Sequence, residues 1–295
     1  MSASPQRFID LHIHSNFSDG AFSPEDLLQQ AKAADLSAIA IADHDSVGGV
    51  SVAMPAGAAL GIEVIPAVEL SVQFKQWQDV HLLGYGIDVS DELFLEKLNH
   101  FRERRERRNE LILERINTLL QDEGRESIGI NEVLTHSRDA IGRPHIARAL
   151  LGRGYVGSVE EAFRSYLTPC NVPKAYWPID DAIREIRRIG GVAVLAHPTS
   201  VSTNRQELRD IILELQSMGL DGIEAFNNMA HSDDMEFLRR LAIELGLIAT
   251  GGSDYHGIED GLQIGKGRGG IRFSATLLAP LQVRLSERNS QFLSL

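Results

Sequence analysis

The sequence predicts an α/β protein in which a β/α domain is interrupted by an all-helical insertion. Segments typical of strands and helices alternate over residues 8–90 and again over residues 178–257, as in folds built from a parallel sheet and its covering helices. Between them, residues 91–177 contain only helical patterns. The chain has 295 residues, a length at which a β/α barrel often forms one domain. We therefore expect a discontinuous barrel domain, residues 1–90 and 178–295, and an insertion domain between them.

The first alternating block begins with residues 8–14, "FIDLHIH", a short apolar run that indicates a buried strand. Ser23 is a suitable N-cap and Pro24 a suitable first residue for the helix that follows. Residues 38–45, "AIAIADHD", have the continuous apolar character of a strand buried on both faces. The remaining elements expected in this block are helices at 23–34 and 46–61, the second despite Pro55, and strands at 63–70 and 80–87.

The second block repeats the alternation. Helices are expected at 180–190, 204–219 and 233–246, and strands at 192–198, 222–226 and 248–254. The apolar residues recur at helical spacing in the first set and run continuously in the second.

The insertion is expected to hold a long helix, residues 91–123, which lacks Pro and Gly, and two shorter helices, residues 142–154 and 158–167. Arg105 and Arg108 fall on the apolar stripe of the long helix. An arginine in a core-facing row needs a partner or an anion. We therefore expect each of them either to pair with a carboxylate of the barrel or to contact phosphate.

Composition excludes several classes of protein. The single cysteine, Cys170, excludes a disulfide framework and a cysteine-rich zinc site. No apolar run approaches the ~20 residues that span a bilayer, and no signal sequence precedes the first strand. The net charge of −12 argues against binding duplex nucleic acid through a basic surface. We expect a cytoplasmic protein with no membrane partner.

Histidine and carboxylate residues lie at or near the ends of the predicted strands, in every unit with a clear strand except residues 222–226. They are His12, His14, Asp43, His44, Asp45, Glu69, His81, His197, Asp254 and His256. His12 and His14 point to the same face because they lie two positions apart on a strand. The C-terminal ends of barrel strands converge on the face that carries active sites, although His81 lies near the start of its strand.

Each of these residues alone has an ordinary structural explanation, as a core histidine, a turn residue or a helix cap. Their recurrence at five strand ends predicts a metal centre. Nitrogen and oxygen ligands without sulfur suit Mn²⁺, Zn²⁺ or Fe²⁺ and do not choose among them. Asp43 and Asp45 are candidates for carboxylates that orient the ligands, and capping of the following helix is an equal alternative for Asp45.

The motifs "DLHIHSNFSDG", "AIADHD", "AVELS", "VHLLGY", "LAHP" and "GGSDYHG" together resemble those of the PHP (polymerase and histidinol phosphatase) family. The resemblance covers residues 8–90 and 178–257 in order. It implies a distorted seven-stranded β/α barrel with three divalent metal ions, Mn²⁺ first among them. Phosphoester hydrolysis would follow from a hydroxide shared by two ions about 3.5–4 Å apart.

Carried over by motif, the resemblance implies three sets of ligands. One ion would be held by His12, His14, Glu69 and Asp254; a second by Glu69, His81 and His197; a third by Asp19, His44 and His256. Asp19 occupies a position that is histidine in some members of the family. No side-chain nucleophile is expected, because the attacking group would come from the metal centre.

The insertion resembles that of a branch of the family that removes the 3'-phosphate of nucleoside 3',5'-bisphosphates, in some members with 5'-to-3' trimming of short oligonucleotides. The resemblance implies substrate contacts for Arg105, Arg108, Arg143 and His145, and the sequence adds Lys174. We expect a phosphatase for such a small nucleotide. The alternatives are a 5'-to-3' exoribonuclease on short single-stranded RNA, a histidinol phosphatase or another small-molecule phosphatase, and a non-catalytic nucleotide sensor.

Overall fold

The computed structural model describes residues 6–134, 142–258 and 261–292. The strands are β1 (Phe8–Ile13), β2 (Leu36–Ile41), β3 (Glu63–Val64), β4 (Ala67–Phe74), β5 (Trp77–Tyr85), β6 (Trp177–Pro178), β7 (Val192–Leu195), β8 (Gly222–Phe226), β9 (Ile248–Gly251) and β10 (Phe273–Ser274). The α-helices are α1 (Pro24–Ala33), α2 (Gly48–Leu60), α3 (Glu92–Asp122), α4 (Ile130–Leu134), α5 (Arg143–Gly152), α6 (Val159–Ala162), α7 (Ile179–Arg188), α8 (Arg205–Ser217), α9 (Ser232–Leu245) and α10 (Leu278–Phe292). The α/β class and the alternation are confirmed.

The strands form two sheets. One has the order β10-β1-β2-β3 and the other the order β6-β4-β5-β7-β8-β9. Isolated bridges join Ile13 to Tyr255 and His44 to Glu69, so each sheet touches the other at two places. A single closed sheet of seven strands is not present among the described residues.

The strand expected at residues 63–70 is divided in two. Pro66 separates β3 from β4, because a proline has no N–H to donate to a ladder. β4 then continues to Phe74 and pairs with β5 in an antiparallel hairpin. Glu69 therefore lies in the first half of β4, not at the end of a strand as the sequence suggested.

The antiparallel direction of β5 accounts for the position of His81. β5 runs antiparallel to both β4 and β7, and Leu82 pairs with Leu195, the last residue of β7, so His81 lies just past the C-terminal end of β7. His81 pairs with Ser71 in this register, and its carbonyl accepts from the N–H of Ala196 at 3.0 Å. A histidine early in an antiparallel strand thus reaches the same edge as a histidine that follows a parallel strand.

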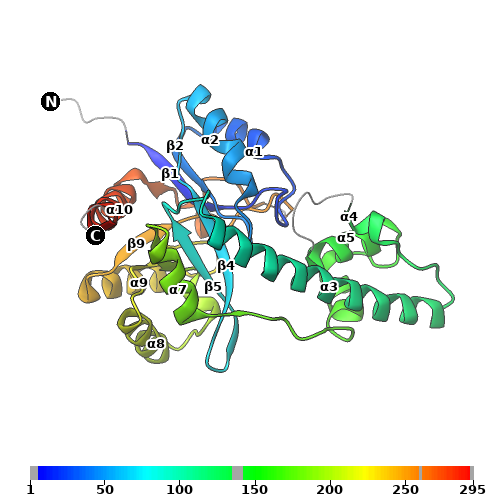
Figure 1. Ribbon diagram of the computed structural model, residues 1–295. Helices are drawn as coiled ribbons and strands as arrows, with labels where there is room; N and C mark the ends of the chain where they lie inside the picture. Colours follow the sequence, from blue (N-terminus) through cyan, green and yellow to red (C-terminus); the bar gives the residue numbers. More distant parts are fainter. Residues whose placement is uncertain (1–5, 135–141, 259–260, 293–295) are drawn as a thin grey trace.

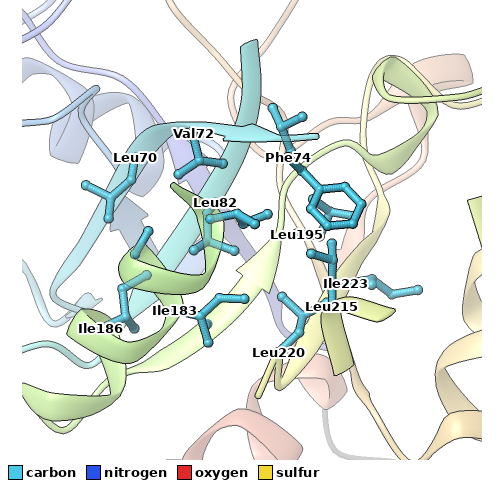
Figure 2. Close-up of a cluster of buried hydrophobic side chains, with 14 of the residues drawn as sticks. Leu70, Val72, Phe74, Leu82, Ile183, Ile186, Leu195, Leu215, Leu220 and Ile223 are labelled. Carbon is cyan, nitrogen blue, oxygen red and sulfur yellow. The ribbon is translucent and has the colours of Figure 1, made fainter. Parts of the chain in front are cut away.

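The core of the larger sheet lies between its strands and the helices α7, α8 and α9. Figure 2 shows Leu70, Leu82 and Leu195 of the strands facing Ile183 of α7 and Leu215 of α8. The smaller sheet, which contains β1 and β2, is covered by α1 and α2 (Figure 1). The apolar strands are buried on both faces, as their composition predicted.

The long helix α3 projects away from the strands, with α4 and α5 near its far end (Figure 1). Its first turn is capped by Asp91, whose carboxylate accepts from the N–H of Phe94 at 2.8 Å. The near end packs Phe94 and Leu98 into the core of the larger sheet. The far end joins a separate apolar cluster that extends to Cys170. The helical segments expected in residues 91–177 are confirmed where the structure describes them.

The C-terminal elements were not indicated by the sequence pattern. β10 pairs with β1 in antiparallel register, and α10 packs Leu278 and Leu281 against the strands. Within the described residues, no helix is both long enough and apolar enough to cross a bilayer.

Candidate metal centre and substrate cavity

The nine predicted ligands converge at one edge of the two sheets. They come from β1 and the loop after it, the residues that follow β2, β7 and β9, and the interiors of β4 and β5. Glu69 lies at the centre of the group and is fully buried. Its Oε1 lies 3.0 Å from His81 Nδ1 and 3.2 Å from His197 Nε2. Its Oε2 lies 2.9 Å from His44 Nδ1 and 3.3 Å from His14 Nε2.

The side chains form three groups in which the potential ligand atoms all lie within 4.8 Å of one another. The groups are His12, His14, Glu69 and Asp254; His44, Glu69 and His81; and His14, Asp19, His44 and His256. The first matches one expected ligand set in full. In the second, His44 takes the place expected for His197, and the third adds His14.

His44 belongs to two groups because its two nitrogens face different neighbours. Nδ1 faces Glu69, while Nε2 lies 3.8 Å from Asp19 Oδ2. His197 nevertheless remains beside the second group, with its Nε2 3.3 Å from His81 Nδ1. The nine residues therefore lie together as expected. The observed groups differ from the expected ligand sets in the placement of His14, His44 and His197.

Four atoms of this cluster test whether it suits metal ions. His14 Nδ1, Asp19 Oδ1, His44 Nδ1 and Glu69 Oε2 are buried, and within the described part of the chain they make no hydrogen bond of good geometry. A buried polar atom without a hydrogen bond is costly unless another partner satisfies it. Imidazole nitrogens and carboxylate oxygens in such a position suit a divalent cation.

At His14, Glu69 and Asp254 the electrostatics of the cluster favour the protonation states that bind metals. Burial, together with the neighbouring His256 and His44, lowers the pKa of His14 to about 3, so its imidazole is neutral at physiological pH. Burial opposes ionisation of Glu69, but His81 and His44 outweigh it and hold the pKa of Glu69 well below its usual range. Asp254 is likewise kept ionised, since His12 and His14 outweigh the effect of burial on its pKa. Neutral imidazole and ionised carboxylate are the forms that coordinate.

The hydrogen bonds of Asp43 and Asp45 described here go to backbone N–H groups and to serine and arginine side chains, not to the histidine rings. Asp43 accepts from the N–H of Ser15 at 2.7 Å and from the hydroxyls of Ser15 and Ser18 at 2.6 and 2.7 Å. It therefore shapes the loop between His14 and Asp19. Asp45 accepts from the N–H of Ser71 at 3.0 Å and pairs with the guanidinium of Arg105. It does not cap α2, whose first turn has no side-chain cap.

A cavity of about 330 Å³ lies between the cluster and residues of α3, of the start of α5 and of the segment around Lys174. Asp19, His44 and His81 form one part of its wall. The remaining lining residues are Ser71, Asp79, Arg105, Arg108, Asn109, Gly142, Arg143, Pro144, Phe163 and Lys174. Four cations thus face the same space as three of the predicted ligands.

Two of these four cations, Arg105 and Arg108, are held in position by hydrogen bonds to the protein. Arg105 pairs with Asp45, which fulfils the expectation of a partner among the carboxylates beside the sheet. Arg108 donates from Nε to the carbonyl of Val172 at 2.6 Å and from a terminal nitrogen to Asn171 at 2.7 Å, so these partners are a carbonyl and an amide within residues 91–177 and not the expected carboxylate.

The other two cations share one carboxylate. Lys174 Nζ lies 3.0 Å from Asp79 Oδ1, and Arg143 lies 3.9 Å from Asp79 Oδ2. Burial opposes ionisation of Asp79, but the Lys174 ammonium outweighs it and lowers the pKa of Asp79 to about 2. Asp79 has a positive φ of 55° and lies where the register between β4 and β5 shifts, as a residue of a β-bulge can.

His145 differs from the other predicted substrate residues. It is 1% exposed and does not line the cavity. Its Nδ1 accepts from the N–H of Gly142 at 2.9 Å, which caps the start of α5. The helix N-terminus was located correctly, and the Nδ1 atom of His145 bonds to the backbone at that terminus.

Glu224 of β8 is a site residue that the sequence analysis missed, because residues 222–226 were the one strand set aside. Its side chain is fully buried. Oε1 lies 3.0 Å from His12 Nδ1, and Oε2 accepts from the N–H of His197 at 2.8 Å. Ser200 Oγ lies 2.9 Å from His197 Nδ1. A glutamate inside an otherwise apolar run was the available signal.

A mixed α/β fold with nine histidine and carboxylate side chains beside a cationic cavity defines a metal-dependent hydrolase of anionic substrates. The model of the PHP domain matches residues 10–151. The chain is 34% identical over 262 residues to the 3',5'-nucleoside bisphosphate phosphatase of Chromobacterium violaceum, covering 86% of this chain and 88% of the relative. It is 31% identical over 263 residues to a 5'-3' exoribonuclease of Haemophilus influenzae, covering 87% and 93%.

A solved structure gives the same result. A protein of Bifidobacterium adolescentis, assigned to the metal-dependent phosphoesterases, superposes with a TM-score of 0.82 at 28% identity, covering 96% of this chain and 98% of the other. The chain therefore belongs to the PHP domain family, and it is a metal-dependent phosphoesterase.

Proposed function

We propose that this enzyme removes the 3'-phosphate of nucleoside 3',5'-bisphosphates. The observation that carries the proposal is the cavity, in which predicted metal ligands and four cations face one space. A substrate with two phosphates needs two anion sites, one at the reacting group and one at a distance. The relative from Chromobacterium violaceum, whose name gives this activity, supports the choice of substrate.

The proposed centre holds three divalent ions, with Mn²⁺ as the first candidate and Zn²⁺ or Fe²⁺ as alternatives. The ligands would be His12, His14, Asp19, His44, Glu69, His81, His197, Asp254 and His256. When bound, such ions lower the pKa of a coordinated water and polarise phosphoryl oxygens. No protein nucleophile enters the proposal, because the described residues that line the cavity include no cysteine and only one hydroxyl side chain, Ser71, which shares Arg105 with Asp45.

The protein residues would bind and orient the substrate. Arg143 and Lys174 are the cations best suited to the distant phosphate, because their shared partner Asp79 is half exposed and can release them. Arg105 is already neutralised by buried Asp45, so it would add a fixed hydrogen-bond donor more than a net charge. Arg108, held by Asn171 and Val172, would keep its remaining N–H groups in a fixed orientation.

Phosphate release tests this proposal directly. Purified protein with added Mn²⁺ should release one phosphate from adenosine 3',5'-bisphosphate and yield the 5'-monophosphate. Asp254→Asn should remove the activity with little change in fold, and Arg143→Ala should chiefly raise KM. If Arg143→Ala has the KM of the wild type, the role given to Arg143 is wrong. If no phosphate is released from any nucleotide, the proposed function is wrong.

A second candidate is 5'-to-3' exoribonuclease activity on short single-stranded RNA. The name of the Haemophilus influenzae relative favours it, and the same cations would bind a 5'-phosphate. Incubation with a 5'-phosphorylated trinucleotide separates the two activities. Accumulation of mononucleotides supports the exonuclease, whereas an intact trinucleotide restricts the enzyme to small phosphate esters. We keep the prediction that duplex nucleic acid and membranes are not partners and that the enzyme is cytoplasmic.

We also propose that the two sheets are parts of one distorted seven-stranded barrel. The bridge from His44 to Glu69 joins β2 to β4, and the bridge from Ile13 to Tyr255 joins the segment after β9 to β1. The resulting ring passes through β1, β2, β4, β5, β7, β8 and β9. In this proposal residues 1–90 and 178–295 form the barrel domain, and residues 91–177 form the insertion domain.

A further inference from the structure

Glu224 occupies an unusual place for a carboxylate. It lies in the middle of β8, 0% exposed, with apolar residues on either side along the strand. Burying such a group is costly unless it is paired and hydrogen-bonded. Glu224 does not line the cavity, so direct contact with substrate does not explain it.

The two oxygens of Glu224 reach two different strands. β8 lies between β7 and β9, and the register sets Ile223 beside Leu195, so Glu224 comes level with the residues that follow β7. Oε2 accepts from the backbone N–H of His197 at 2.8 Å. Oε1 reaches His12 of β1 at 3.0 Å. One carboxylate thus connects two of the nine clustered residues.

The contact with His12 fixes which nitrogen faces the cluster. Nδ1 points to Glu224, while Nε2 lies 3.4 Å from Glu69 Oε1 and 3.5 Å from Asp254 Oδ1. An acceptor at Nδ1 keeps the ring proton there and leaves the lone pair of Nε2 directed at a metal, as outer carboxylates do for metal-bound histidines.

The contact with His197 supports a strained backbone. His197 has φ 25° and ψ 64°, a conformation that costs a non-glycine residue energy and persists only when its surroundings enforce it. The bond from its N–H to Glu224 is one such restraint. The hydroxyl of Ser200, 2.9 Å from His197 Nδ1, then orients the ring so that Nε2 faces Glu69.

We propose that Glu224 is a positioning residue of the metal centre, which sets the tautomer of His12 and the backbone of His197 at the same time. This proposal rests on the proposed role of His12 and His197 as metal ligands. Glu224→Gln is the informative change, because a glutamine has nearly the same size but only one acceptor oxygen. It can serve His12 or the N–H of His197, and not both.

The experiment measures metal binding as well as activity. Metal-free wild type and Glu224→Gln are titrated with Mn²⁺ and Co²⁺ in competition with a chelator, and the number and affinity of sites are compared. We expect the variant to lose about 10- to 100-fold in affinity at one or more sites. We expect kcat to fall with KM nearly unchanged, since Glu224 lies outside the cavity.

Glu185→Gln is the matched control. Glu185 is also buried, at 5% exposure, but its carboxylate pairs with Lys97 of α3 and with Arg188 of its own helix, α7. Its replacement should lower the free energy of unfolding and leave metal affinity at the wild-type value. If Glu224→Gln loses only stability and binds metal as the wild type does, Glu224 is structural and the inference is overturned.

A measurement on the wild type covers the case in which Glu224→Gln does not fold. Nitrogen-15 correlation spectra of the histidine rings report which nitrogen carries the proton. The inference requires a proton on Nδ1 of His12 in the metal-loaded protein, and an unprotonated Nδ1 there overturns it. A wild type that binds no metal at all would overturn the proposed centre together with this inference.

Discussion

Gly252→Ala is the smallest change that should disrupt the metal centre. Gly252 lies between β9 and Asp254, against β1. A Cβ added there would lie 2.3 Å from His12 Cβ and 2.5 Å from His12 N. Ordinary carbon–carbon contacts are about 3.5–4.0 Å, so the two segments must separate by about 1.2 Å. Backbone atoms of a buried strand cannot rotate away as a flexible side chain can.

The separation would act on the ligands themselves. The N–H of Asp254 donates to the carbonyl of His12 at 2.8 Å, and the N–H of Gly252 donates to the carbonyl of Phe226 at 3.0 Å. Moving this segment therefore displaces Asp254 from His14, whose Nε2 lies 3.1 Å from its carboxylate. Overpacking a filled site costs about 1–3 kcal/mol, and a misplacement of about 1 Å costs about 100-fold in rate.

The assay combines urea unfolding, metal content and phosphate release. Gly152→Ala is the control, because no atom lies within 4 Å of a Cβ added at the last residue of α5. That change should be neutral or slightly stabilising. Gly252→Ala should lose stability, metal and activity together. If it unfolds at the same urea concentration as the control and retains its metal, the close approach to His12 does not limit this site.

Three further outcomes follow from the charges of the site. Burial raises the pKa of Asp43 from 3.8 to about 6, so the folded state takes up a proton that the unfolded chain binds only at lower pH. Between pH 7 and pH 4 the free energy of unfolding of the metal-free wild type should therefore rise by up to about 3 kcal/mol relative to that of Asp43→Asn. A difference between the two proteins that stays constant in urea unfolding would contradict this. Asp79→Asn should release Lys174 and lower KM for a bisphosphate a few-fold with kcat unchanged; steady-state kinetics showing a higher KM would reverse the role of Asp79. Removal of metal by a chelator should abolish phosphate release and lower Tm, because Glu69 and its neighbours lose their counter-ions, and added Mn²⁺ should restore both; retained activity after chelation would exclude the metal centre.

The alternation of side-chain direction along a strand explains which positions the sequence predicted well. His12 and His14, two positions apart, do point into one cluster, and the end of β7 brings His197 beside them. Such inferences need only the alternation of side chains along a strand and the convergence of strand ends. The same reasoning located Arg105 and Arg108 on the buried side of α3, where the structure has both of them bonded.

Inferences that depend on neighbouring strands were less successful. The interruption at Pro66 moved Glu69 from the expected strand end to the first half of β4, and the antiparallel direction of β5 brought His81 into the site. Pairing direction is a long-range property, and no local pattern reports it. Glu224 carried a local signal, a glutamate in an apolar run, but its partners His12 and His197 are distant in sequence.

The ligands and the cations rest on different cores, and this separation has a chemical consequence. The predicted ligands lie in or after strands packed in the clusters of the two sheets, whereas Arg143 and Lys174 border an apolar cluster built within residues 91–177. Several contacts join the parts at the cavity, among them Arg105 with Asp45, Lys174 and Arg143 with Asp79, and Arg148 with the carbonyl of Asp19 at 2.9 Å. Substitutions in the insertion can therefore change which phosphate ester is bound while the metal ligands stay in position. Such an arrangement is consistent with two relatives of similar sequence identity to this chain, one named as a bisphosphate phosphatase and the other as an exoribonuclease.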